Sequence, residues 1–405
     1  MQIKSHKLTT SNFYIILILC FILLPILALF NRYIFYELNV FFLLIFLCLY
    51  TIYNNTKFSI KLFIGSPALY FFAFVVYVLS RYQTGKSLDE NLQLLSLLSY
   101  FIFFLVASIL FYKKKYISDL VWFVCTMYLI AYIARISLDI EAAINGTNLS
   151  SGIVVISFIP FVLLNLQKYT SKYYTTSFLI IFFLIIWCSI IGSRAATLGL
   201  MLFLITFTLW PLITKNRVIY IGYFLSCVLF FLTGCLLYIF FVTDANFSLF
   251  SDSGIGILTK RIGTRLDIWV HLVQIIINGD WVLGNGSNLN TKSVTPLSYL
   301  DFEMNRKNLS SHSLILESIY RIGVVGLGLF FLFILSLWNY MWKSRECNVT
   351  RIVCSSIIML VPICYTSTFL IFSTFHLRCA FFWIIFGFGY GFATYYNKNY
   401  NSKLS

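Results

Sequence analysis

Charged residues are scarce in this chain of 405 residues. Asp, Glu, Lys and Arg together make up 11% of it, whereas a soluble domain usually carries about 25%. The shortage excludes an ordinary water-soluble protein. Hydrophobic residues reach 60% and aromatic residues 19%, and that much apolar surface excludes an intrinsically disordered chain.

The cysteines lack the arrangements that bind metal or form a disulfide framework. All ten are scattered singly, mostly within apolar runs, with neither CxxC spacing nor a His/Cys cluster. Neither a zinc site nor a network of disulfides is therefore predicted. We interpret these cysteines as small buried hydrophobic residues.

Long apolar runs dominate what is present. A helix needs roughly 20 apolar residues to cross a membrane, and runs of about that length recur along the chain. They predict an all-α polytopic membrane protein with about twelve transmembrane helices. The expected spans are 13–30, 34–53, 61–80, 92–112, 117–134, 152–167, 176–193, 195–213, 218–242, 313–338, 352–373 and 379–394. The chain thus divides into residues 1–242 with nine helices, a large periplasmic loop at 243–312, and residues 313–405 with three helices and a cytoplasmic tail.

The net charge of +15 is explained by orientation in the membrane. If the N-terminus is cytoplasmic, the inside segments collect 16 basic residues against only Asp119 and Glu346. That asymmetry matches the positive-inside rule and predicts that both termini are cytoplasmic. The basic excess then requires no nucleic-acid partner. The inside basic residues are Lys4, Lys7, Lys57, Lys61, Lys113, Lys114, Lys115, Lys168, Lys172, Lys215, Arg217, Lys343, Arg345, Arg351, Lys398 and Lys403.

A first candidate site is the outer hairpin at Gly192-Ser193-Arg194. Arg194 is followed at once by small residues and another apolar run, which places it at the membrane boundary, where ionisable groups usually have a partner. The small residues around Arg194 favour an internal anion site. The alternative is an arginine that extends to lipid phosphates.

A second candidate is the stretch 261–278 in the long loop. Asp267, His271, Gln274 and Asn278 form a polar stripe on a helix, and Trp269, Leu272, Val273 and Ile276 form the opposite one. This amphipathic helix would lie on the membrane or cover the spans. Arg261 and Arg265 fall on its apolar face, where they require an anion, either a ligand or a lipid phosphate. The glycines Gly284 and Gly286 after it permit a tight turn.

A third candidate begins at His312. Ser310 or Ser311 is expected to cap a helix, so that His312 lies in its first turn, where the positive helix end favours a neutral, basic imidazole. Glu317 and Arg321 are four residues apart and can pair within the helix. A capping histidine with a structural ion pair is the alternative.

These stretches, in this order, resemble the O-antigen ligase/polymerase superfamily of bacterial surface-polysaccharide enzymes. The shared features are Ser193-Arg194-Ala195, then Arg265 with Gly-x-Gly after it, then His312 followed by Glu317 and Gly323. The family's usual His-Asn pair is His312-Ser313 here. The resemblance implies a GT-C-like architecture with a large periplasmic loop.

The resemblance also implies a glycosyltransferase that needs neither metal nor cofactor and uses an undecaprenyl-diphosphate-linked glycan. Arg194 and Arg265 would bind the diphosphate and stabilise its developing charge. His312 would take the proton from the acceptor hydroxyl, with Arg261, Glu317 and Arg321 positioning these groups. The site would face the periplasm at the bacterial inner membrane.

Three functions follow, in order of preference. An O-antigen ligase transfers the glycan to a sugar of lipid A-core in lipopolysaccharide biosynthesis. An O-antigen polymerase instead uses a second lipid-linked repeat unit as acceptor. A polysaccharide transporter or flippase would need charged or helix-breaking positions near mid-membrane, and the predicted spans hold only prolines (Pro25, Pro160, Pro211, Pro362) and no acid there.

Overall fold

The computed structural model describes residues 65–81, 172–190, 192–244, 272–286, 313–366 and 377–404, Trp269, and parts of 97–108 and 156–167. Regular structure in this described part is helical, without strands, so the all-α prediction is confirmed there. The helices are α4 (Ser66–Arg81), α9 (Tyr173–Ile190), α10 (Arg194–Thr208), α11 (Trp210–Ile213), α12 (Arg217–Asp244), α15 (Leu314–Tyr340), the short 3-10 helix η4 (Met341–Ser344), α16 (Asn348–Thr366) and α18 (Leu377–Leu404).

Two of these helical stretches are long and apolar enough to cross a membrane, judged by length and composition. They are Tyr173–Ile190 and Leu314–Ser344. Four shorter apolar helices accompany them at Ser66–Arg81, Arg194–Thr208, Arg217–Thr233 and Asn348–Cys364. The predicted spans 13–30, 34–53 and 117–134 lie outside the described residues, as does most of the loop 243–312.

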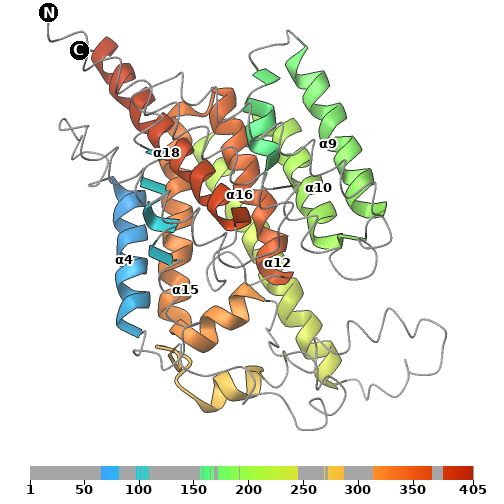
Figure 1. The fold of residues 1–405 in the computed structure, drawn as a ribbon, viewed down its shortest axis with the longest axis vertical. Coiled ribbons are helices and arrows are strands. Elements are labelled where there is room, and N and C mark those ends of the chain that lie inside the picture. Colours follow the sequence, from blue (N-terminus) through green and yellow to red (C-terminus); the bar gives the residue numbers. More distant parts are fainter. Residues whose placement is uncertain are drawn as a thin grey trace, which may run out of the picture.

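The described helices pack together in one bundle. Figure 1 shows α4 against α15 on one flank and the α9–α10 hairpin beyond α16 on the other. Helix α10 packs so closely on α16 that a Cβ at Gly199 would lie 2.8 Å from the Met359 carbonyl oxygen. Because apolar side chains gain nothing by leaving lipid for protein, such backbone approaches through small residues are typical of membrane bundles.

The centre of the bundle is filled by aromatic rings. Phe71 of α4 stacks on Phe333 of α15 and on Trp383 of α18, each at 4.6 Å between ring centroids. Tyr220 and Trp338 hold α12 to α15 through two reciprocal bonds: the Tyr220 hydroxyl donates to the Trp338 carbonyl at 2.7 Å, and the Trp338 indole donates to the Tyr220 carbonyl at 3.1 Å. These bonds satisfy the polar atoms that buried Tyr and Trp bring with them.

The structure corrects one predicted span. The span expected at 195–213 is two helices, because α10 ends before Leu209 and α11 starts again at Trp210. Pro211 in the first turn of α11 has no N–H, so it cannot continue the backbone hydrogen bonds of α10. Helix α18 continues through the polar end of the chain to Leu404.

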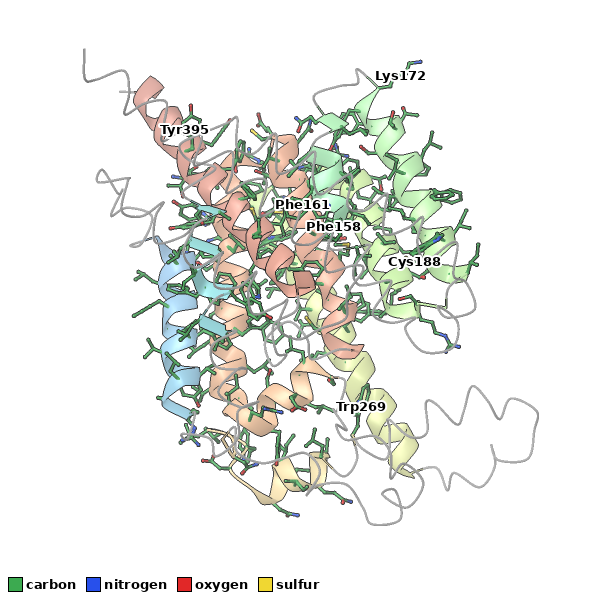
Figure 2. All side chains as sticks on the ribbon, in the orientation of Figure 1. Phe158, Phe161, Lys172, Cys188, Trp269 and Tyr395 are labelled. Carbon is green, nitrogen blue, oxygen red and sulfur yellow. The ribbon has the colours of Figure 1, made fainter. Side chains whose placement is uncertain are left out.

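The bundle has two chemically different ends. At one end Arg351 donates to the carbonyl of Phe207, Trp210 donates to the carbonyl of Arg345, and Arg217 donates to the side chain of Asn339. These contacts place the first residues of α12 and α16 beside the last residues of α10 and α15. At the opposite end lie the start of α10 and the start of α15. Figure 2 shows Lys172 at the first end and Trp269 at the second.

Candidate functional site

Helix α15 is interrupted at Gly323. This residue has φ 68° and ψ −179°, a conformation essentially restricted to glycine. The short segment 314–322 therefore leaves the long remainder of α15 at an angle, which Figure 1 shows at the lower end of the helix. The interruption breaks the i→i−4 ladder, so the freed backbone groups need other partners.

The turn after the loop helix supplies those partners. The amides of Val324 and Val325 donate to the carbonyls of Trp281 and Val282 at 3.0 and 3.2 Å. In return the carbonyls of Tyr320 and Arg321 accept from the amides of Asn285 and Gly286 at 2.8 and 3.0 Å. Residues 281–286 thus take the places that a continuous helix would have filled.

Two glycines make this insertion possible. Gly284 has φ 79°, and a Cβ there would lie 2.4 Å from the amide nitrogen of Gly323; a Cβ at Gly323 would lie 2.1 Å from the Val282 carbonyl oxygen. Neither approach tolerates a side chain. The tight turn predicted from Gly284 and Gly286 is confirmed, since both have positive φ, but its docking onto α15 was not foreseen.

The loop helix packs on the start of α15. Residues 272–278 are helical, and Trp269, Leu272 and Ile276 are buried against Leu316 and Tyr320 of α15. Gln274 and Asn278 are exposed. For the described part of the predicted helix both stripes are confirmed, and the apolar one covers protein.

Glu317 and Arg321 form the ion pair that their spacing predicts. The Arg321 Nε donates to Glu317 Oε1 at 2.6 Å, and the side chains are 12% and 2% exposed respectively. The capping prediction is wrong by two or three residues: Ser313 is the N-cap, its hydroxyl accepts from the Leu316 amide, and the helix begins at Leu314. His312 therefore precedes the cap in sequence instead of lying in the first helical turn.

The residues in the first segment of α15 take part in four different sets of contacts. Leu314 and Ile322 join the main core, Ile315 joins a second apolar cluster, Leu316 and Tyr320 meet the loop helix, and Glu317 pairs with Arg321. Leu314 and Ile315 also line an apolar pocket whose other walls come from α12, α16, α18 and the later part of α15. The same short segment of α15 therefore carries the ion pair and contributes to the wall of an apolar pocket.

Arg194 opens α10 at the same end of the bundle. Its neighbours Ala195 and Ala196 are buried, its own side chain is exposed, and Ser193 before it is buried with no hydrogen-bond partner for its hydroxyl. The structure thus brings Arg194, Glu317 and Arg321 to one end. The other predicted site residues, Arg261, Arg265 and His312, lie outside the described residues.

Sequence reasoning missed Tyr77 and Arg81 on α4. The Arg81 Nη2 donates to the carbonyl of Gly284 at 2.7 Å. The Tyr77 hydroxyl is shared between the carbonyls of Ile322 and Leu283, at 3.1 and 3.3 Å. Their four-residue spacing at the end of an apolar helix was the available signal, because it places both on one face.

Comparison with protein-family models, curated proteins and solved structures finds no match for this chain. Within the described ranges, no group of three or more His, Cys, Asp or Glu side chains is arranged to hold a metal ion.

Proposed function

We propose that this protein is a membrane glycosyltransferase of the O-antigen ligase type. It would transfer a glycan from an undecaprenyl-diphosphate carrier to a sugar hydroxyl of lipid A-core, on the periplasmic face of the bacterial inner membrane. The sequence resemblance supplies the reaction class. The geometry at the start of α15 supplies the physical support.

One observation carries the proposal. The Glu317–Arg321 pair and two residues that line the apolar pocket, Leu314 and Ile315, belong to one short segment, 314–322, which begins two residues after His312. A polyprenyl-diphosphate donor needs these two environments together: an apolar space for isoprene units and a polar, charged boundary for the diphosphate. A buried pair of charges is costly to form and contributes little stability over an apolar pair, so its presence there favours a functional role.

The proposed chemistry divides among the site residues. Arg194 and Arg265 would bind the diphosphate, because a guanidinium makes two parallel bonds to phosphate oxygens. They would also stabilise the charge that develops as the carrier leaves. His312 would accept the acceptor's hydroxyl proton as that oxygen attacks the anomeric carbon. Glu317, Arg321 and Arg261 would position these groups.

The distribution of charge supports the proposed orientation. Lys172, Lys215, Arg217, Lys343, Arg345 and Arg351 all belong to the end of the bundle opposite the kink, and Glu346 is the acid among them. A basic end is the cytoplasmic one by the positive-inside rule. The segment 314–322 and the turn 281–286 would then face the periplasm.

Reconstituted transfer tests the proposal. Purified protein in lipid vesicles is given an undecaprenyl-diphosphate-linked glycan, with and without lipid A-core. We expect glycan on lipid A-core from the wild type, and a fall of about 100-fold or more for His312→Ala and Arg265→Ala. His271→Ala and Arg217→Ala are the matched controls, because they remove the same residue types elsewhere, and both should retain transfer.

The acceptor separates the two glycosyltransferase functions. Transfer that requires lipid A-core supports the ligase, whereas extension of the lipid-linked glycan without it would identify a polymerase. Deleting the gene makes the same distinction in cells: without a ligase lipid A carries no glycan, and without a polymerase it carries one repeat. Normal transfer by the His312 and Arg265 variants would overturn the site assignment.

A further inference from the structure

We propose that Tyr77 and Arg81 of α4 are positioning residues that clamp the interruption of α15 and so fix the place of the Glu317–Arg321 pair. Neither belongs to the diphosphate or proton-transfer groups above. Each acts on backbone carbonyls of the junction between residues 281–286 and 320–325, which we name the ladder junction. The catalytic consequence rests on the proposed function, but the clamp itself does not.

Tyr77 binds one of the backbone carbonyls that the interruption of α15 affects. A continuous α15 would direct the amides of residues 324, 325 and 326 to the carbonyls of Tyr320, Arg321 and Ile322. The first two carbonyls instead accept from the turn 281–286. The third, of Ile322, accepts from the Tyr77 hydroxyl. Tyr77 therefore completes the exchange that the turn begins.

Arg81 secures the other side of the junction. The Arg81 guanidinium donates from Nη2 to the carbonyl of Gly284 at 2.7 Å. A charged donor makes a stronger bond to a carbonyl than a neutral donor does. Its Nε is buried and makes no hydrogen bond, so the part-buried guanidinium has given up some contact with water at the place where it reaches this carbonyl.

The clamp is rigidly supported from behind. Phe74 and Val78 of α4 are buried in the core. The ring centroid of Phe74 lies 5.6 Å from that of Phe330 in the long part of α15. Helix α4 is therefore fixed to the part of α15 after Gly323, while Tyr77 and Arg81 reach the part before it and the inserted turn. The angle between the two parts of α15 is set through α4.

Two readouts on the full-length protein in nanodiscs or vesicles test the clamp. Amide hydrogen exchange of residues 281–286 and 322–325 reports the junction directly. In Tyr77→Phe and Arg81→Gln we expect exchange there to accelerate about tenfold, with peptides of α10 and α16 unchanged. Arg81→Lys keeps the charge and one donor and should restore part of the protection. Tyr70→Phe, an exposed tyrosine on the same helix, is the matched control.

Transfer kinetics then test the positioning role. A displaced ion pair should lower kcat about tenfold in Tyr77→Phe, with KM for the lipid-linked donor unchanged. Unchanged exchange in both variants would overturn the clamp. Accelerated exchange with full kcat would overturn the positioning role. If exchange accelerates but the wild type transfers no glycan to either acceptor, the clamp stands and the proposed function fails. Unaltered exchange in α10 and α16 excludes general misfolding as the cause.

Discussion

The two ends of the bundle use arginine and backbone carbonyls in opposite ways. At the basic end, Arg351 donates from Nε and Nη2 to the carbonyl of Phe207 and lies over the rings of Phe207 and Tyr174, 4.3 and 4.7 Å from their centroids. This contact satisfies a carbonyl near the end of α10, where a helix has unpaired acceptors and favours a cation. Regular helices finish there.

At the kinked end, Arg81 and Tyr77 bind carbonyls where a helix is interrupted instead of finished. The carbonyls that they bind are available only because residues 281–286 interrupt the hydrogen-bond ladder of α15. Backbone in an unusual conformation persists when its surroundings over-determine it, and it is concentrated at functional sites. The same pairing of arginine and carbonyl therefore stabilises regular helix ends at one end of the bundle and a strained arrangement at the other.

The largest expected effect comes from removing the strained arrangement. Gly323→Ala places a Cβ 2.1 Å from the Val282 carbonyl oxygen at positive φ, so either the turn must leave or the helix must straighten. We expect a loss of about 3 kcal/mol or more in the free energy of unfolding, of which the left-handed backbone alone accounts for about 1–2 kcal/mol. Reversible unfolding in mixed detergent micelles measures it.

Gly328→Ala is the matched control on the same helix. A Cβ there meets nothing within 4 Å, and alanine favours the helix over glycine by about 1 kcal/mol. This variant should therefore be as stable as the wild type or more stable. Equal stability of the two alanine variants would contradict the assignment of the interruption to Gly323.

Residue types and their spacing predicted the local features of this structure but not the contacts between distant segments. Apolar runs predicted most of the described helices, and the four-residue spacing predicted the Glu317–Arg321 pair. The interruption of α15 was not predicted. Gly323, Gly326 and Gly328 stand close together, and only the partner segment 281–286 determines which of them breaks the helix. Ser313, and not Ser310 or Ser311, is the cap, and Arg81 went unnoticed as a partner of Gly284 because 203 residues separate the two in the chain.

A second prediction compares the ion pairs of the two ends. Glu317 is buried and Arg321 is 12% exposed, whereas Glu346 at the basic end is 81% exposed and lies 3.9 Å from Arg345. Glu317→Gln should cost about 1–3 kcal/mol of stability, because it removes a buried carboxylate charge from the Arg321 guanidinium. Glu346→Gln should cost under about 1 kcal/mol, as exposed pairs do.

The double variant Glu317→Gln/Arg321→Gln sharpens this result. Removing both charges also removes the cation that has lost the Glu317 carboxylate, so the double variant should be more stable than Glu317→Gln alone, while glycan transfer stays low in both. The same unfolding assay and the vesicle transfer assay measure the two quantities. A double variant that transfers normally would show that the pair is structural only.

The smallest effect is a difference in pH dependence at the basic end. Burial, and to a lesser degree the neighbouring Glu346, raises the pKa of the Cys347 thiol above its ordinary value. Only the thiolate reacts with maleimides, so a protein with Cys347 as its sole cysteine should react slowly near pH 8. As the pH increases, the rate for a free cysteine, with a pKa of about 8.5, levels off, whereas the rate for Cys347 should still increase. Glu346→Gln removes the smaller cause and should move the profile slightly toward lower pH. A membrane-impermeant maleimide on vesicles of known orientation measures the rate and the sidedness together. Reaction from the cytoplasmic side with the profile of a free cysteine would contradict the burial, and reaction from the periplasmic side would reverse the assignment of the two ends.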